Sequence, residues 1–573
     1  MFLCRKQFFL IRLLWLVVAL LPTTTLSAEV QVPSSVEAGR ITKDIEKNSK
    51  RQSLEESTLK PGKKEKPQYN VSPFPIPEGA DKVTLILHDL IIEGNTVFNP
   101  EDFRFIYQQY LYKQITLNKL YLWADEITKL YRDKGYFLSV AVVPNQEIKN
   151  NVARIKITEG YISEVAISEK KLSAQKLIKA YVDKLTNIRP IKVADLESFI
   201  LSINDLYGYS FKSVLSPIEN NNDGAVKLSL IVTKDKPHFK IGSDNYSSRY
   251  IGPHEVNALA SIEFIPLQRT DLSILNSAFD NRLTYAAINH KFFIAPNYYV
   301  NLSYSYSKSH PGYLLTDQKI NSESKSFATT IGYQIIRQRL ENLDATIGFD
   351  AQNSNSDILF DPQTRDKTRT ISGALAYNFY DKYNNYNYIN LEVTKGIDVL
   401  GSSHEGDLHL SRATGDPKFI KAELSIARLQ SINNYFSLLA MADAQLASNP
   451  LLSSQEFGYG GQNYGRAFDS SDITGDSGIK TSFQLNYKEI DYLSYAKLYP
   501  YIFYDIGLVT NRNTGQKKEE SGASSGIGSK FELKKNISGN VALAWPLTRD
   551  RSSPIYGQST NAPRLLLQMS SDF

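Results

Sequence analysis

The sequence predicts a mainly β protein, with a C-terminal antiparallel transmembrane β-barrel of about 16 strands preceded by two small α/β domains. Three observations predict this fold class. Apolar and polar residues alternate with period two from residue 237 to residue 573. Residues 82–236 contain the same β-α-α-β-β unit twice. The chain has 35 Tyr and 27 Phe but no long apolar run after residue 28, as expected for barrel strands, which alternate.

Residues 1–28 have the three parts of a secretory signal peptide. Arg5, Lys6 and Arg12 form a basic region, an apolar stretch runs from residue 13 to residue 21, and small residues end at Ala28. The apolar stretch is shorter than the ~20 residues of a spanning helix, so we favour a cleaved signal over a membrane anchor. The sequence therefore predicts that the chain is exported.

The composition argues against several classes of function. The one cysteine, Cys4, lies in the predicted signal, so the exported protein has no thiol for a disulfide, a zinc site or a nucleophile. None of the seven histidines forms an HExxH pair, and no GxSxG, Walker or dinucleotide fingerprint follows a suitable strand. The net charge of +5 is mild, and basic and acidic residues are interspersed. We expect no enzyme, no catalytic or metal site and no nucleic-acid partner.

Residues 29–60 have a helical pattern and are predicted to form a helix. This helix is polar, because the segment lacks a stripe of large apolar residues. Residues 61–81 contain five prolines and several lysines, which is typical of an extended linker. The simplest role of this region is spacing. A polar helix on a long tether is also what a removable plug would look like, and we keep both interpretations.

Residues 82–160 and 161–236 are predicted to be two small domains of similar design. In the first, the strand "KVTLILHDLIIEGNTVF" leads into the helices "PEDFRFIYQQYLYK" and "TLNKLYLWADEITKLYRDKGY" and the strands "FLSVAVVP" and "NVARIKITEG". The second begins with "YISEVAISE" and ends with "YSFKSVLSP" and "AVKLSLIVT". A small three-stranded sheet has a free edge that can receive an extended chain. The alternative is a pair of inert spacers.

Three segments of these domains carry a family resemblance: "IEGNTVF" (92–98), "YRDKGYFLSVAVVPNQEIKNNVARIKITEG" (131–160) and "EGYISEV" (159–165). They resemble polypeptide-transport-associated (POTRA) domains. The resemblance implies a partner-binding region, in which we place Ile92, Gly94, Asn95, Phe98, Gly135, Tyr136 and Gly160. Gly94 and Gly135 suit turns in which φ is positive.

The region 237–573 has one apolar and one polar face along its predicted strands. In "YVNLSYSYSKS" the apolar face holds Val300, Leu302, Tyr304 and Tyr306, and the opposite face is Asn and Ser. "ISGALAYNFYD" and "IKTSFQLNYKE" follow the same pattern. This pattern fits either a half-buried soluble sheet or a membrane barrel with a wet lumen.

Three features favour the barrel. Tyrosines recur near strand ends, as in interfacial girdles, and long polar loops such as 307–326 alternate with shorter ones. The chain also stops on a strand, "PRLLLQMSSDF", with Phe573 at its apolar C-terminus. At about 21 residues per strand and loop, the region holds roughly sixteen strands.

The stretch "FGYGGQNYGRAFDSSDITGDSG" (457–478) is glycine-rich and acidic, and its only cation is Arg466. In "YIFYDIGLV" the even-numbered residues 502–508 form the apolar face, so Phe503, Asp505 and Gly507 are predicted to face inward. A loop that folds back into the barrel would bring Arg466 to Asp505, since a guanidinium binds a carboxylate through two parallel hydrogen bonds. The alternatives are an exposed acidic loop and a calcium site, although "DSSDITGD" lacks the spacing of a calcium loop.

Four motifs extend the family resemblance: "GRAF" (465–468), "GDSG" (475–478), "FYDIG" (503–507) and "SDNYSSRYIG" (243–252). They resemble the in-folded sixth loop, its barrel-wall partner and the first barrel strand of the TpsB transporters of two-partner secretion, the haemolysin secretion/activation type. The family loop usually reads Val/Ile-Arg-Gly-Phe/Tyr, whereas here Gly465 precedes the arginine and Ala467 follows it. The resemblance implies a loop–barrel lock made of Arg466, Asp505, Phe468, Gly465, Phe503 and Gly507.

The resemblance implies a translocase of the bacterial outer membrane with its soluble domains in the periplasm. It would recognise a large exported (TpsA-like) passenger and secrete it through the barrel, without ATP or cofactor. Outer-membrane lipid and the barrel-assembly machinery are the other implied partners, and Phe573 is the implied insertion signal. The alternatives are a barrel-assembly factor, which more often carries further POTRA copies, and a passive porin, which does not need the soluble repeats.

Overall fold

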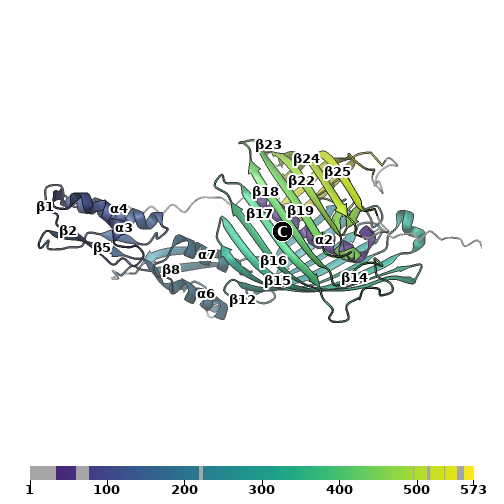
Figure 1. The fold of residues 1–573 in the computed structure, drawn as a ribbon, viewed down its shortest axis with the longest axis horizontal. Coiled ribbons are helices and arrows are strands. Elements are labelled where there is room, and N and C mark those ends of the chain that lie inside the picture. Colours follow the sequence, from purple (N-terminus) through teal and green to yellow (C-terminus); the bar gives the residue numbers. More distant parts are fainter. Residues whose placement is uncertain are drawn as a thin grey trace, which may run out of the picture.

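A computed structural model describes residues 34–59, 76–173, 175–218, 223–493, 496–512, 517–533, 536–550 and 560–573. The predicted signal peptide and most of the predicted linker lie outside these residues. Two small α/β units extend from one end of a large β-barrel (Figure 1). In the described part of the chain, no helix is both long enough and apolar enough to cross a membrane.

The predicted fold class is confirmed. Within the described residues, sixteen antiparallel strands close a barrel, in which the first strand, β9, pairs with the last, β27. The short strand β23 follows β22 and pairs with the same neighbour, β24, so the two form one barrel strand. The strands are β9 (His238–Asp244), β10 (Glu255–Ile262), β11 (Arg269–Ser277), β12 (Leu283–Ala295), β13 (Tyr298–Ser309), β14 (Asn321–Arg337), β15 (Glu341–Ile358), β16 (Asp361–Tyr380), β17 (Tyr386–Gly396), β18 (Ile420–Ser431), β19 (Phe436–Ala447), β22 (Ser477–Tyr487), β23 (Ile490–Leu493), β24 (Ala496–Thr510), β25 (Glu519–Leu533), β26 (Ile537–Pro546) and β27 (Arg564–Asp572).

The period-two pattern places apolar side chains on the outside of the barrel. Leu302 and Tyr304 of β13 are exposed outside, whereas Ser305 and Ser307 are buried inside. The connection after β13 is shorter than the predicted loop 307–326, because both strands continue into it and leave only residues 310–320, with the 3₁₀ turn η3 (Tyr313–Gln318). The ends of β13 and β14 that extend into the predicted loop carry inward serines, which bond a helix in the lumen. Ser307 Oγ, for example, donates to the carbonyl oxygen of Ala38 at 2.9 Å.

The first α/β unit contains β1 (Thr84–Ile86), β2 (Asp89–Glu93), α3 (Glu101–Tyr107), η2 (Gln108–Tyr110), β3 (Gln114–Thr116), α4 (Leu117–Asp133), β4 (Val140–Val142) and β5 (Val152–Thr158). Its main sheet has the order β2-β5-β4. The single strand predicted at the start is split in two, because β1 pairs with β3 and β2 pairs with β5. The break falls at the fully buried Leu87.

The second unit contains β6 (Tyr161–Ile167), α5 (Lys170–Ser173), α6 (Lys176–Thr186), α7 (Val193–Asn204), β7 (Tyr209–Pro217) and β8 (Ala225–Lys234), with the sheet order β6-β8-β7. It packs directly on barrel turns. Leu267 and Phe293 of the barrel belong to its hydrophobic core. Asp205 at the end of α7 receives two hydrogen bonds from Arg337, at 2.6 and 2.7 Å. These contacts place the second unit at the mouth of the barrel.

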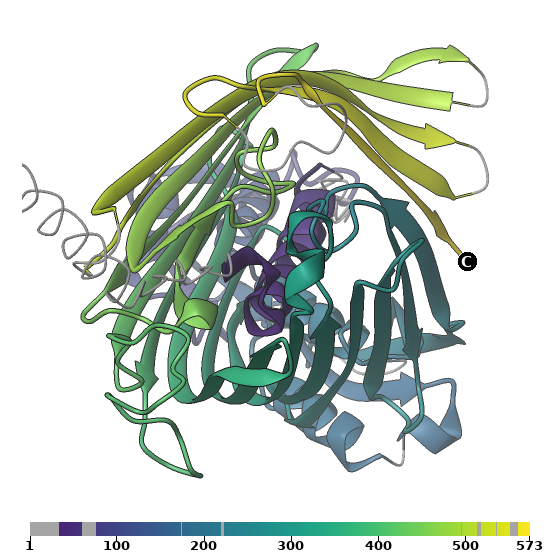
Figure 2. The same ribbon diagram turned by 90° about the vertical axis from the view of Figure 1, so that its right-hand side faces the viewer.

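A helix lies inside the barrel (Figure 2). After the short turn η1 (Ser34–Val36), α2 (Ala38–Leu59) crosses the lumen. Near its start, Val36 and Ile41 pack against Ile251, Leu283 and Leu315 of the barrel and its connections. Farther along, polar and charged side chains make its contacts. We call α2 the lumen helix.

Candidate functional site in the barrel lumen

The chain between β19 and β22 folds into the barrel instead of lying over its rim. Residues 448–476 include a short hairpin of β20 (Phe457–Tyr459) and β21 (Ile473–Gly475), and most of these residues are buried. Gly460 and Gly465 have φ of +116° and +70°, which residues with a Cβ rarely adopt. We call residues 448–476 the in-folded loop.

Arg466 of the in-folded loop is bonded to Asp505 of β24 in the barrel wall. Nη2 of Arg466 lies 3.0 Å from Oδ1 of Asp505, and Nε and the backbone N–H both donate to Oδ2 at 3.1 Å. The Asp505 side chain is fully buried and that of Arg466 is 6% exposed. Because both groups have lost their water, each depends on the other for its charge balance.

Neighbouring side chains supply further hydrogen bonds to Arg466 and Asp505. Arg466 also donates to Gln484 and Ser482, both at 2.8 Å, and Ser482 donates to Asp505 at 2.7 Å. The guanidinium lies over the ring of Phe503, 3.7 Å from its centroid. A flat cation on an aromatic face with in-plane acceptors is a geometry that Arg provides and Lys does not.

Gly507 and Gly465 lie against a residue that the sequence did not single out. The ring of Tyr459 covers both glycines, and a Cβ at Gly507 would lie 2.2 Å from that ring. Phe468, which is 1% exposed, packs beside Tyr459 with 6.0 Å between ring centroids. The six predicted lock residues therefore form one cluster with Tyr459 at its centre, and their role in transport stays a prediction.

Two further buried arginines hold the in-folded loop. Arg564 of β27 bonds the carbonyl oxygen of Phe468 at 2.6 Å and the carboxylate of Asp469 at 3.1 Å, and it also bonds the backbone after β9. Arg412, between β17 and β18, pairs with Asp476 and Glu456. The alternation in β27 could have placed Arg564 inside the barrel. Leu565 and Leu567 form the outward apolar face, and Arg564 lies on the opposite face of the strand. No sequence period could have placed Arg412, because it lies in a long connection.

The lumen helix contacts the in-folded loop. Arg40 donates to Ser471 Oγ at 2.7 Å and to the backbone oxygen of Glu456. Asp44 accepts a hydrogen bond from Ser471 at 2.7 Å. Arg51 donates to the hydroxyl of Tyr464. The two segments that fill the lumen are therefore bonded to each other as well as to the wall.

The residues predicted to bind a partner shape the first unit and its junction with the second. Gly94 has φ of +82°, and a Cβ there would lie 2.2 Å from the backbone oxygen of Ile157. Asn95 accepts hydrogen bonds from the N–H of Phe98 and from the hydroxyl of Tyr131. Ile92 lies in β2, half-buried. The carbonyl of Gly135 accepts the N–H of Val193 in the second unit.

Tyr136 and Gly160 complete this set at the junction. The ring of Tyr136 lies under the Lys192 ammonium, and a Cβ at Gly160 would lie 2.4 Å from Cβ of Leu138. Partner binding by these seven residues stays a prediction. At the other end of the chain, Phe573 exchanges backbone hydrogen bonds with Phe239 of β9, and its role as insertion signal also stays a prediction.

A sixteen-strand barrel that carries POTRA-like domains at one end and a buried arginine loop in its lumen defines a class: outer-membrane β-barrel proteins with periplasmic POTRA domains. Sequence comparison gives the particular family. The model of the haemolysin secretion/activation protein family ShlB/FhaC/HecB matches residues 224–531, more than half of the chain. The ShlB-type POTRA domain model matches residues 85–160. The chain belongs to the ShlB/FhaC/HecB family.

Individual relatives agree with this assignment. The heme/hemopexin transporter protein HuxB of Haemophilus influenzae is 22% identical over 486 residues, which are 81% of this chain and 84% of that protein. CdiB from Escherichia coli has a similar structure, with a TM-score of 0.72 and 16% identity over 93% of this chain and 99% of its own. CdiB from Acinetobacter baumannii gives a TM-score of 0.64 and 14% identity over 95% and 99%.

The family settles the functional class. The protein is an outer-membrane transporter of two-partner secretion, and it works with a large secreted partner protein that leaves through the β-barrel. Its family and fold are those of transporters and not of enzymes. The barrel-assembly factor and the passive porin are thereby rejected. Among the described residues, no group of three His, Cys, Asp or Glu side chains could hold a metal ion.

Proposed function

We propose that the structure is the resting state of this transporter, in which the lumen helix and the in-folded loop close the path of the passenger. The in-folded loop packs apolar as well as polar side chains against the wall. One observation carries the proposal: past the apolar contacts at its start, the lumen helix is held mainly by hydrogen bonds and ion pairs. Such contacts can be exchanged with water or with another chain, whereas a packed apolar core cannot be opened cheaply. The Arg466–Asp505 pair then holds the loop until secretion begins.

The passenger docks first on the periplasmic domains. The edges of their sheets, β2 and β4 in the first unit and β6 and β7 in the second, are unpaired among the described strands. Ile91 of β2 is exposed at such an edge, and Ile86 of β1, the strand before it in the chain, is also exposed. An extended segment that adds to the sheet would gain backbone hydrogen bonds and cover these apolar side chains.

The protein uses no catalytic group, cofactor or nucleic acid, and folding of the passenger outside the cell gives direction. Leu302, Ile502 and other outward side chains of the barrel contact outer-membrane lipid. Phe573 is the signal that the barrel-assembly machinery reads.

Deleting residues 82–160 tests the docking step. We expect a heat-modifiable barrel in the outer membrane, together with passenger that accumulates in the periplasm. Substituting Arg104 on the exposed surface of α3 by Ala serves as a control for general damage to the unit, and secretion should continue in that variant. Undiminished secretion by the deletion variant would remove the docking role from the first unit.

A further inference from the structure

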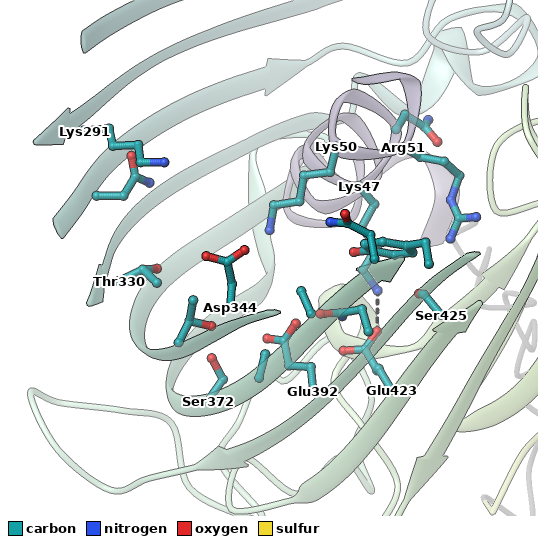
Figure 3. A pocket seen from close by; sticks show the side chains of 18 of the residues that line it. Lys47, Lys50, Arg51, Lys291, Thr330, Asp344, Ser372, Glu392, Glu423 and Ser425 are labelled. Carbon is teal, nitrogen blue, oxygen red and sulfur yellow. Dashed lines mark hydrogen bonds and ion pairs between the residues drawn. The ribbon is translucent and has the colours of Figure 1, made fainter. Parts of the chain in front are cut away.

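Three cations of the lumen helix lie at a spacing of four residues and bind three different barrel strands. Lys43 Nζ lies 3.2 Å from Oδ2 of Asp350 on β15. Lys47 Nζ lies 2.6 Å from Oε1 of Glu423 on β18 (Figure 3). The third cation, Arg51, pairs with Asp443 on β19. Residues four apart share one face of a helix, so the helix presents a cationic stripe to the wall.

The wall opposite this stripe holds four carboxylates, including a directly facing pair. Glu392 of β17 and Glu423 of β18 are directly opposite each other in the strand register. Like charges in such positions destabilise a sheet unless a cation lies between them. Lys421 of the wall contacts Glu423 at 3.1 Å, and Lys480 is opposite Asp443. We call Asp350, Glu392, Glu423 and Asp443 the acidic row.

A cavity of about 990 Å³ lies between the lumen helix and this wall. Lys47, Lys50 and Arg51 line one side, and Glu392 and Glu423 line the other (Figure 3). Asn204 to Gly208 of the second unit also line it, so the cavity reaches the periplasmic mouth of the barrel. A chain that arrives from the POTRA side can therefore reach Glu392, Glu423 and Asp443 of the acidic row while the helix is still in place.

We propose that the acidic row is a second binding surface of the transporter, which takes cationic segments of the passenger in competition with the lumen helix. The inference rests on the proposed function, because it assumes that the helix leaves during secretion. The helix shows what the row binds: Lys and Arg side chains spaced along an extended or helical segment. Departure of the helix would remove Lys43, Lys47 and Arg51 and leave Lys421 and Lys480 to face four carboxylates in a confined lumen, which is costly unless replacement cations arrive. A Lys- or Arg-bearing passenger segment supplies them and opens the path at the same step.

The experiment measures release of the helix by a cationic peptide. Thr42 is 1% exposed and bonds Ser307 at 2.7 Å, so a cysteine at this position is shielded while the helix is seated. In the full chain with Cys4→Ser and Thr42→Cys, a thiol reagent should react slowly. Hexalysine added from the periplasmic side should raise the rate at least fivefold in low salt, and hexaglutamate should not. In 1 M salt the effect should vanish, because the Debye length falls to about 3 Å.

Glu392→Gln is the discriminating variant. Glu392 forms none of the three ion pairs described above, so the helix should stay seated while the row binds hexalysine more weakly and the labelling response falls. Ala38→Cys, at an equally buried site, is a second reporter in case Thr42→Cys disturbs the helix. A parent protein that ignores hexalysine, or an undiminished response in Glu392→Gln, would overturn the proposal. Passenger secretion by the parent protein is measured in parallel. Secretion without a labelling response to hexalysine would reject the binding role of the acidic row but not the proposed function. A lack of secretion would reject the proposed function itself.

Discussion

Arg466 and Asp505 form one of several buried contacts of the in-folded loop, beside those of Arg564 and Arg412. An exposed salt bridge contributes about 0–1 kcal/mol, but removal of one partner from a buried pair costs about 3–5 kcal/mol because the other charge is left without compensation. The 0% and 6% exposures of the two side chains put this pair in the second class. The loop should therefore respond strongly to a change of either residue.

Replacing Arg466 by Ala should lower secretion at least tenfold while the barrel still inserts, since Asp505 is then left buried without a cation. Asp505→Ala should behave alike, and protease added outside should cleave within residues 448–476 in both variants. The exchange Arg466→Asp with Asp505→Arg should recover part of the activity. Arg512→Ala, which changes an exposed arginine beyond β24, is the control. Wild-type secretion by Arg466→Ala would leave the loop without the role assigned to it.

Gly507 should not tolerate even one added methyl group. The Cβ of Gly507→Ala would lie 2.2 Å from the ring of Tyr459, so the ring and the loop must move. Gly373 of β16 is the matched control, because nothing lies within 4 Å of a Cβ at that position. We expect loop cleavage by external protease in Gly507→Ala and not in Gly373→Ala. Equal protection of the two variants would show that Tyr459 does not need this glycine.

At the scale of single residues, the alternation along the strands predicted which side chains face the lumen. Alternation in β24 placed Asp505 inside, and the lone cation of an acidic loop suggested its partner. Tyr459 and Arg412 were missed because their contacts depend on how the loop folds back, which no local pattern encodes. The POTRA-like residues Gly94 and Asn95 were placed in a partner-binding region, whereas their visible contacts build a turn.

At the scale of elements, the polar character of α2 is explained by its surroundings. A helix of this length without an apolar stripe has little to gain from a hydrophobic core, but it can bond a wet lumen wall through Lys43, Lys47 and Arg51. The sequence predicted the helix and allowed a plug, but it could not show which strands the helix would meet.

Removing residues 30–57 should raise ion conductance in planar bilayers, because the lumen of a sixteen-strand barrel is wide enough to carry water and ions. Single-channel recordings of the full chain provide the reference. Unchanged conductance would mean that the in-folded loop alone closes the pore.

The joint between the second POTRA-like unit and the barrel should weaken in alkali. Burial raises the pKa of Tyr181 to about 12, and its hydroxyl oxygen accepts the N–H of Asn297 on a barrel turn at 3.1 Å. A raised pKa means that the folded state holds the proton more tightly, so this stabilisation is complete below about pH 10 and is lost between about pH 10 and pH 12. Hydrogen exchange at Asn297 should rise in this window, and Tyr181→Phe should remove the added pH dependence. A rise of the same size in Tyr181→Phe would assign it to other groups.

At the scale of the whole molecule, composition and periodicity predicted the architecture well. Period-two strands and two α/β repeats led to the barrel and its POTRA-like domains, and the family assignment confirms the function that the motifs implied. Two features could not be predicted: the docking of the second unit on barrel turns through Asp205 and Arg337, and the filling of the lumen by two segments bonded to each other. Both depend on contacts between residues more than a hundred positions apart.

The central claim is that the passenger crosses the membrane through the lumen of this barrel. The most direct test places a photo-crosslinking amino acid at Asn390 of β17, which lines the lumen cavity, during active secretion. The matched control is Ile389, the next residue of the same strand, which is exposed on the outer face. We predict crosslinks between the passenger and position 390 and none from position 389. Active secretion without crosslinks from position 390, or with equal crosslinks from both positions, would contradict passage through the lumen.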